Sequence, residues 1–191
     1  DSLTELEADN TMLRTIGEQP VNNLELSGVM EVSAARAQLR AASHYVQAKG
    51  WHFNTNKRMR LAPDRDGFIN LPANCLRVDT VGRSGRIDVV KRGSRLYDRV
   101  ANSFVFKNAV VVDMVINLDF DELTEDAKKY VIARATRRFQ EGVVASQVLE
   151  EFTRQDEFEA KVDLESAESE NADYNILTDN YPNIRTMARR W

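Results

Sequence analysis

Hydrophobic residues at the start of the chain recur with helical spacing. The apolar positions that share one helical face are Leu3, Leu6, Leu13 and Ile16. Ser2 and Glu5 have the spacing of a capping box, in which a hydroxyl and a carboxylate bind free backbone amides at a helix start. Gly17 and Pro20 are typical helix-ending residues. A first helix is therefore predicted, followed by a loop from 17 to 30.

The next segment carries the clearest apolar stripe of the sequence. Its members alternate between three- and four-residue spacing: Val32, Ala35, Leu39, Ala42 and Val46. This narrow stripe predicts a second helix that packs on other helices, and its small alanines allow a close approach. Gly50 is expected to end this helix.

The period changes from Trp51 to about Leu118. The short stretches in which apolar and polar residues alternate are Leu76–Asp79, Ile87–Val89, Phe104–Phe106 and Val110–Ile116. Glycine, asparagine and aspartate turn signals separate them at intervals of about 8–12 residues, which predicts an antiparallel meander. Arginines alternate with the apolar residues, so one face of the sheet is expected to be solvated and basic.

Helical spacing then returns. Asp121 or Thr124 can cap a third helix that runs to about Glu141. Its inner face comprises Leu123, Ala127, Val131, Ala135 and Phe139. A fourth helix is expected from about Ser146, with the apolar positions Val148, Leu149, Phe152, Phe158 and Val162. Acidic residues crowd in after Phe152, so the second half of this helix should be exposed or dock outside the subunit.

These elements predict an α+β fold. Two helices before the strands and two after them can close one four-helix bundle, formed by residues 1–50 and 118–170. An antiparallel β-meander domain, residues 51–117, would be inserted in this bundle and project from one end. Residues 171–191 are expected to form an extended C-terminal tail that contains Pro182.

Composition narrows the class of protein. The 191 residues are 42% hydrophobic and 29% charged, which is ordinary for a globular domain. No apolar run approaches the length of about 18 residues that a membrane helix needs, and no signal peptide opens the sequence. Because Asp1 stands where a natural start would carry Met, we expect the true start to lie upstream. The single Cys75 excludes an intramolecular disulfide and favours assembly in a reducing compartment.

Charge is divided unevenly along the chain. Residues 57–107 carry 12 basic and 5 acidic side chains, a net charge of +7, although the whole chain has a net charge of −4. Residues 118–172 carry 7 basic and 15 acidic side chains, a net charge of −8. This asymmetry predicts two surfaces with different partners.

Motifs for catalysis are missing from the sequence. It contains no phosphate-binding GxxxxGK[ST], no dinucleotide-binding GxGxxG and no GxSxG, and its only histidines are His44 and His52. Carboxylates cluster near the last two predicted helices: Asp119, Asp121, Glu122, Glu125, Asp126, Asp156, Glu157 and Glu159. A glycosidase pair could arise among them, but helix starts and solvated faces explain them more simply. We therefore expect no catalytic residue, no metal and no cofactor.

Two basic segments are candidate partner-binding sites. The first lies in the strand region and includes Arg83, Arg86, Arg92 and Arg95, which could face a protein, solvent or a nucleic-acid backbone. The second is the C-terminal Arg189–Trp191, because arginine and tryptophan dominate binding hot spots. A frayed terminus is the alternative for that second segment.

Several motifs occur in a characteristic order: Ile16–Val21 (IGEQPV), Gly50–Asn54 (GWHFN), Leu96–Arg99 (LYDR), Leu118–Phe139 and Asp173–Leu177 (DYNIL). With the order of helices and strands, they resemble tail tubular protein A, the head-to-tail adaptor family of short-tailed bacteriophages. The resemblance covers most of the chain. It implies a virion tail protein, assembled in the host cytoplasm, that forms a dodecameric ring between the portal and the nozzle made by tail tubular protein B.

The resemblance also implies that genomic DNA passes through the ring lumen and that tail fibres attach near the nozzle junction. It transfers no catalytic residue. The candidates for the portal side are Tyr181, Arg189, Arg190 and Trp191. Since ring subunits pack head to tail, we expect Arg83, Arg86, Arg92 and Arg95 to contact an acidic surface in the ring or nozzle.

Three hypotheses remain distinct at this level. The favoured one is a structural adaptor without enzymatic activity, membrane contact or sequence-specific DNA binding. The second is a tail-associated polysaccharide or peptidoglycan hydrolase, which needs a carboxylate pair in a cleft. The third is a nucleic-acid-binding module, whose affinity for DNA would fall steeply with salt.

Overall fold

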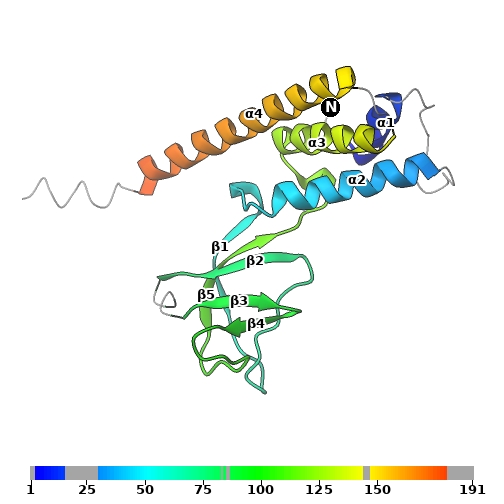
Figure 1. Ribbon diagram of the computed structural model, residues 1–191. Helices are drawn as coiled ribbons and strands as arrows, with labels where there is room; N and C mark the ends of the chain where they lie inside the picture. The colour runs from blue at the N-terminus through cyan, green and yellow to red at the C-terminus, as the bar shows by residue number, and fades with distance from the viewer. Residues whose placement is uncertain (1–2, 16–29, 83, 85–86, 144–146, 180–191) are drawn as a thin grey trace, which may run out of the picture. The chain divides into compact units, whose positions relative to one another are not determined.

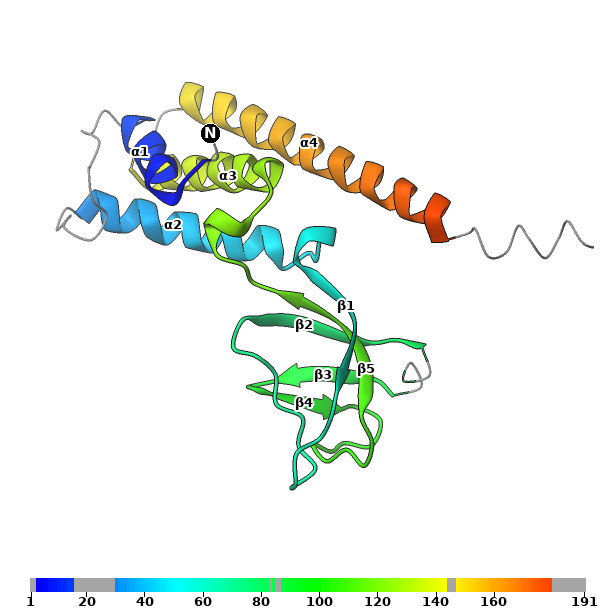
Figure 2. The same cartoon turned by 180° about the vertical axis from the view of Figure 1, so that it is seen from behind.

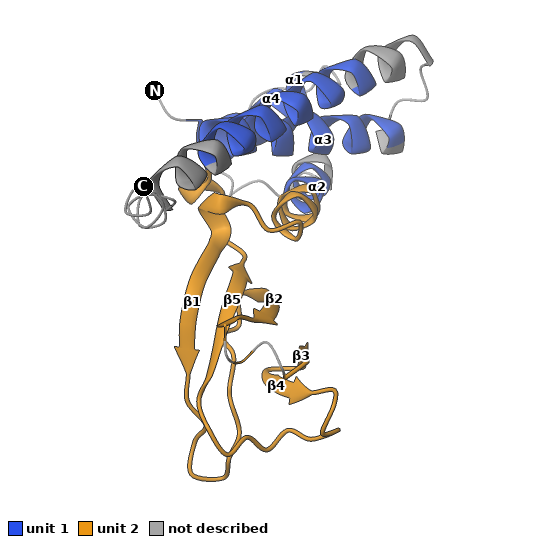
Figure 3. Ribbon diagram, turned by 90° about the vertical axis from the view of Figure 1, so that its left-hand side faces the viewer, with its two compact units in different colours: residues 1–39, 124–191 blue, residues 40–123 orange. Residues whose placement is uncertain are grey.

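The structure is a computed structural model that describes residues 3–15, 30–82, 84, 87–143 and 147–179 (Figure 1). Its class is α+β, with four helices and antiparallel sheets in the described residues. The chain divides into two compact units (Figure 3). The helical unit comprises Asp1–Leu39 and Thr124–Trp191, and the sheet unit comprises Arg40–Leu123.

The helical unit begins with α1, Glu5–Thr15. Its capping box joins Thr4 and Glu7: the Thr4 amide donates to Glu7 Oε2 at 2.9 Å, and the Glu7 amide donates to Thr4 Oγ1 at 3.3 Å. The expected box between Ser2 and Glu5 involves Ser2, which lies outside the described residues. The Thr4–Glu7 pair has the same spacing, two residues further along. The expected end of this helix at Gly17 lies outside the described residues.

Two further helices confirm the predicted apolar stripes. Four of the five predicted positions in α2, Met30–Gln47, are buried: Ala35, Leu39, Ala42 and Val46. The fifth, Val32, lies outside the described side chains. In α3, Glu125–Val143, and just before it, the buried positions are the predicted Leu123, Ala127, Val131, Ala135 and Phe139. Thr124 caps α3, since its Oγ1 accepts the Ala127 amide at 3.4 Å.

Helix α4, Gln147–Asp179, packs against α3, and α1 also contacts α3 (Figure 1). Because α4 includes residues 171–179, the expected extended tail is wrong over that range. The helix-favouring alanine and glutamates of residues 165–170 directly precede this range, and Asn171 Nδ2 bonds back to the Ala167 carbonyl at 2.9 Å. Residues 180–191, including Pro182, lie outside the described residues.

The described residues of the sheet unit form five strands: β1 Thr55–Leu61, β2 Cys75–Thr80, β3 Val89–Arg92, β4 Arg95–Asp98 and β5 Val110–Ile116. They form a three-stranded antiparallel sheet in the order β1-β5-β2 and a hairpin β3-β4, seen from behind in Figure 2. The strands are antiparallel as predicted, but the meander order is wrong. Strand β5 is the most apolar and alternates buried and half-buried positions, so it takes the centre of the sheet.

Several strand assignments also differ from the sequence expectation. Strand β4 was not predicted, and the expected stretch Ile87–Val89 overlaps β3 only at Val89. Strand β1 was not predicted, since Lys57, Arg58 and Arg60 mask its alternation and its middle is mostly exposed. Phe104–Phe106 was expected to be a strand, but it contributes only an isolated bridge between Val105 and Phe68. The core between the strands is nonetheless compact, and its buried members are Ile69, Leu71, Cys75, Val78, Val89, Leu96, Phe106, Val110, Val112 and Met114.

Asn54, 1% exposed, joins the start and the end of the strand region within the sheet unit. Its Nδ2 donates to the carbonyl of Gln47 at 2.9 Å and to that of Ile116 at 2.8 Å. Its Oδ1 accepts the Trp51 amide at 2.8 Å. One side chain therefore binds the end of α2, the approach to β1 and the end of β5.

Candidate functional site

The hairpin β3-β4 presents two of the predicted arginines on one face. In its register, Arg92 lies opposite Arg95, and Val90 lies opposite Tyr97. Residues directly opposite each other in an antiparallel pair point to the same face, and alternate pairs share that face. The other face carries Val89 and Leu96, which are buried in the sheet core.

Aromatic rings support both guanidinium groups. Arg92 Cζ lies 3.6 Å from the centroid of the Tyr97 ring, and Arg95 Cζ lies 4.1 Å from the centroid of Phe68. The Tyr97 ring meets Phe104 edge to face, with 4.8 Å between the centroids. We call this group of five residues the hairpin face. Its stacking contacts orient the guanidinium groups and contribute about 0.5–1 kcal/mol each at an exposed site.

The two arginines of the hairpin face are both exposed, and neither pairs with a carboxylate in the described part of the chain. Other basic side chains of the sheet unit do pair with carboxylates. Arg99 pairs with Asp88 at 3.3 Å, and Lys57 pairs with Asp113 at 3.1 Å. Like charges directly opposite each other across two strands are destabilising. A negative partner would relieve that repulsion.

The remaining predicted partner residues are not brought together here. Arg83 and Arg86 lie outside the described residues, as do Tyr181, Arg189, Arg190 and Trp191. Their assignments therefore stay predictions. Phe68 and Tyr97, the rings beneath the arginines, were not predicted from the sequence. The Gly93–Ser94 turn was a usable signal, because a two-residue turn places Arg92 opposite Arg95.

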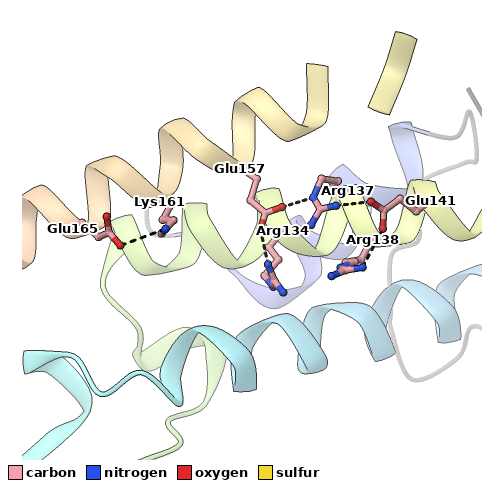
Figure 4. A network of polar contacts seen from close by, with 7 residues as sticks. All are labelled: Arg134, Arg137, Arg138, Glu141, Glu157, Lys161 and Glu165. Carbon is pink, nitrogen blue, oxygen red and sulfur yellow. Dashed lines mark hydrogen bonds and ion pairs between the residues drawn. The ribbon is translucent and has the colours of Figure 1, made fainter. Parts of the chain in front are cut away.

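A network of ion pairs fastens α4 to α3 (Figure 4). Glu157 of α4 accepts from Arg134 Nη1 at 2.6 Å and also from Arg137 Nε. Arg137 further pairs with Glu141. Although burial raises the pKa of Glu157, hydrogen bonds from Arg137 and Arg134 and their charges outweigh it and hold the pKa below its ordinary value. Glu157 therefore serves as a structural anchor between two helices.

The opposite side of α4 leaves apolar groups in contact with water. Phe158 is 65% exposed and Val162 is 41% exposed, and they lie four residues apart on one face of the helix. Glu159 and Glu165, each three residues from Val162, are exposed beside them, and Glu165 also pairs with Lys161 of the same helix at 3.7 Å (Figure 4). We call Phe158, Val162, Glu159 and Glu165 the α4 stripe. The exposure expected for the second half of this helix is confirmed at Phe158 and Val162.

Other carboxylates of the acidic cluster bond locally. Glu122 Oε2 accepts the Asp119 amide at 3.2 Å in the turn before α3. Glu125 pairs with Lys128 at 3.2 Å, and Asp126 pairs with Lys129 at 3.5 Å. These contacts agree with the helix-start interpretation of the cluster.

The described residues contain no group of three or more histidine, cysteine or acidic side chains that could hold a metal ion. His44 and His52 are both exposed. Within the same residues, no helix combines the length and the apolar character needed to cross a membrane.

Comparison with known proteins assigns the chain to a family. A family model described as tail tubular protein matches residues 6–174. Tail tubular protein A of Klebsiella phage KP34 is 32% identical to the chain over 129 residues, which cover 68% of this chain and 67% of that protein. The match to the family model extends over residues of both units and includes the hairpin face and the α4 stripe.

Proposed function

The chain belongs to the tail tubular protein family, and from this membership we propose that it is the head-to-tail adaptor of a short-tailed bacteriophage. As a member of this family, the chain is a structural component of the phage tail in the virion. In the proposal, subunits close into a dodecameric ring between the portal and a nozzle of tail tubular protein B. Genomic DNA passes through the lumen without sequence-specific binding, and tail fibres attach near the nozzle.

One observation beyond the family match supports a ring. The chain exposes a cationic hairpin face and, elsewhere, an acidic helix with an apolar stripe. Subunits of a cyclic ring use two different surfaces, because each subunit contacts its two neighbours head to tail. Two surfaces of opposite charge suit that arrangement, whereas a two-fold dimer would need one self-complementary surface.

The proposal assigns roles to the parts of the chain. The four helices close the predicted bundle, residues 1–50 with 118–170, and build the ring wall around an inserted sheet domain, residues 51–117. The segment from 171 to 191 faces the portal, and the contacting side chains are Tyr181, Arg189, Arg190 and Trp191. The subunits assemble in the host cytoplasm, where the single Cys75 stays reduced.

Native mass spectrometry and negative-stain images of the purified chain, alone and with its cognate portal, test the proposal. A closed ring, or stoichiometric capture by the portal, is the expected result, and the mass of the ring gives the copy number. A chain that stays monomeric and also ignores the portal would overturn the adaptor role. Turnover of purified host polysaccharide, lost in a variant of a single Asp or Glu, would favour the hydrolase hypothesis instead.

A further inference from the structure

We propose that the hairpin face of one subunit binds the α4 stripe of the neighbouring subunit. This inference rests on the proposed ring and names the two surfaces that would meet between its subunits. The hairpin face supplies Arg92 and Arg95 on their aromatic supports. The α4 stripe supplies Phe158 and Val162, with Glu159 and Glu165 beside them.

The α4 stripe needs a partner that is both apolar and basic. Phe158 and Val162 are exposed, so covering their apolar surface lowers the free energy and favours association. The surrounding helix is strongly acidic: residues 154–171 carry two basic and seven acidic side chains, a net charge of −5. Two copies of α4 would therefore repel each other, which disfavours a pair of stripes as the occupant.

The hairpin face has the complementary properties. Its two guanidinium groups lie side by side on opposite strands and pair with no described carboxylate of their own chain. Stacking on Tyr97 and Phe68 leaves their N–H edges available for bidentate bonds to carboxylates. Tyr97 is itself buried, so the apolar surface beside the guanidinium groups comes from the half-buried rings of Phe68 and Phe104. An acidic helix with exposed aromatic and aliphatic groups satisfies both requirements.

The dimensions of the two surfaces agree. Opposed residues in an antiparallel pair have Cβ atoms about 4.5–5.5 Å apart, and arginine side chains can spread several ångströms beyond that. Glu159 and Glu165 are separated by six residues of helix, a rise of about 9 Å. Each guanidinium group can therefore reach one carboxylate while Val162, between them, faces the rings.

A charge-swap series tests the pairing during assembly on the portal. We expect the double variant Arg92→Glu/Arg95→Glu to lose ring formation, and Glu159→Arg/Glu165→Arg to lose it as well. The fourfold variant that combines them should recover at least half of the wild-type ring yield. The control is Arg65→Glu/Lys107→Glu, which makes the same change of charge at exposed positions of the sheet unit and should leave the yield unchanged.

An engineered disulfide locates the contact directly. Cys75 is the only natural cysteine and is buried, so new thiols can be followed without interference. A chain carrying both Arg95→Cys and Glu159→Cys should form a ladder of covalent multimers on oxidation of the portal-bound ring. The matched control pairs Arg95→Cys with Glu170→Cys, because Glu170 is exposed on the same helix but lies eleven residues, a rise of about 16 Å, beyond Glu159. That control should stay monomeric on a denaturing gel.

The outcomes separate this pairing from the adaptor role. If the charge variants fold, by circular dichroism, and still form rings, the pairing is wrong and the adaptor role stands. The same holds if the fourfold variant fails to recover or the disulfide ladder is missing. If the wild-type chain neither forms a ring nor binds the portal, both the adaptor role and the pairing of the hairpin face with the α4 stripe are wrong. Salt-dependent binding of duplex DNA that Arg92→Glu/Arg95→Glu abolishes, with rings intact, would assign the hairpin face to nucleic acid instead.

Discussion

The side-chain amide of Gln47 pairs with the backbone of Leu118 as a second strand would. Leu118 N donates to Gln47 Oε1 at 2.7 Å, and Gln47 Nε2 donates to the Leu118 carbonyl at 3.0 Å. Gln47 is fully buried, and its Nε2 also bonds Ser43 Oγ at 2.9 Å. Two positions 71 residues apart are thus joined inside the sheet unit. Gln47 is the last residue of α2, and Leu118 lies two residues after the end of β5.

Removing this amide should destabilise the protein. Gln47→Leu keeps much of the volume but leaves the Leu118 N–H without a partner in a partly buried place, and leaves the Leu118 carbonyl with only a long bond from Asn117 Nδ2 at 3.5 Å. Each unsatisfied group costs about 1–3 kcal/mol, so the free energy of unfolding should fall by about 2–4 kcal/mol. Urea denaturation measures the loss. Gln155→Leu, at an exposed position of α4, is the control and should change it by less than about 0.5 kcal/mol.

The Glu157 network should make stability depend on pH. Glu157→Gln removes the charge between Arg134 and Arg137, and we expect a loss of about 2 kcal/mol at pH 7. Because the pKa of Glu157 is lowered in the folded state, its contribution is complete above the unfolded value of 4.5 and disappears as the pH falls through the folded value. The difference between wild type and variant should therefore shrink below pH 4.5.

The neighbouring carboxylate Glu159 is the matched control for that experiment. It is exposed and accepts only a bond from Gln155 Nε2 at 2.9 Å among the contacts in the described residues. Glu159→Gln should leave the free energy of unfolding within about 0.5 kcal/mol of wild type between pH 3 and 7. Equal pH profiles for the two variants would contradict the assigned role of Glu157.

Gly50 should tolerate no side chain. Its φ of +79° strains any L-residue, and an added Cβ would lie 2.8 Å from Val115 Cγ2 and 2.9 Å from Arg77 Nη2. We expect Gly50→Ala to lower the free energy of unfolding by about 2–3 kcal/mol. Gly93→Ala also has a positive φ, +62°, but meets open space, and should cost only about 1 kcal/mol. A thermal shift of equal size in both would disprove the clash.

Replacing Arg58 by glycine should raise the free energy of unfolding. It sits in the β1 bulge with φ of +54°, and its amide donates to Asp113 Oδ1 at 2.8 Å. Arg58→Gly removes the backbone strain and keeps that hydrogen bond, so we expect a gain of about 0.5–1 kcal/mol. Arg60→Gly, two residues along the same strand, should instead lose about 0.5–1 kcal/mol. Loss of stability in both variants, measured by urea denaturation, would contradict the strain at Arg58.

The helices were predictable because burial and periodicity agree in them. In α2 and in α3 the apolar positions form one buried stripe along the helix. Their spacing alone was therefore enough to identify Leu39 and Phe139 as core residues. Strand β1 was missed because it lies at the sheet edge and carries three cations among seven residues. The sheet order was also unpredictable, since pairing of β1 with β5 depends on contacts between residues about 50 to 60 positions apart.

The candidate interface was predictable only in part. Net charge identified the strand region as basic, and the Gly93–Ser94 turn predicts that Arg92 and Arg95 oppose each other. Their stacking on Phe68 and Tyr97 depends on tertiary packing that local pattern does not encode. The loss of apolar spacing after Phe152 did indicate the exposed half of α4.

The pairing of Thr55 with Val115 has an evolutionary consequence. The strand region leaves and rejoins the chain through two adjacent, hydrogen-bonded positions, which Asn54 holds together at their base. A segment with such closely spaced ends can be lengthened, shortened or exchanged between relatives without rethreading the polypeptide on either side. Residues 55–116 thus have the geometry of a segment that can be replaced as a unit without interrupting the helices on either side.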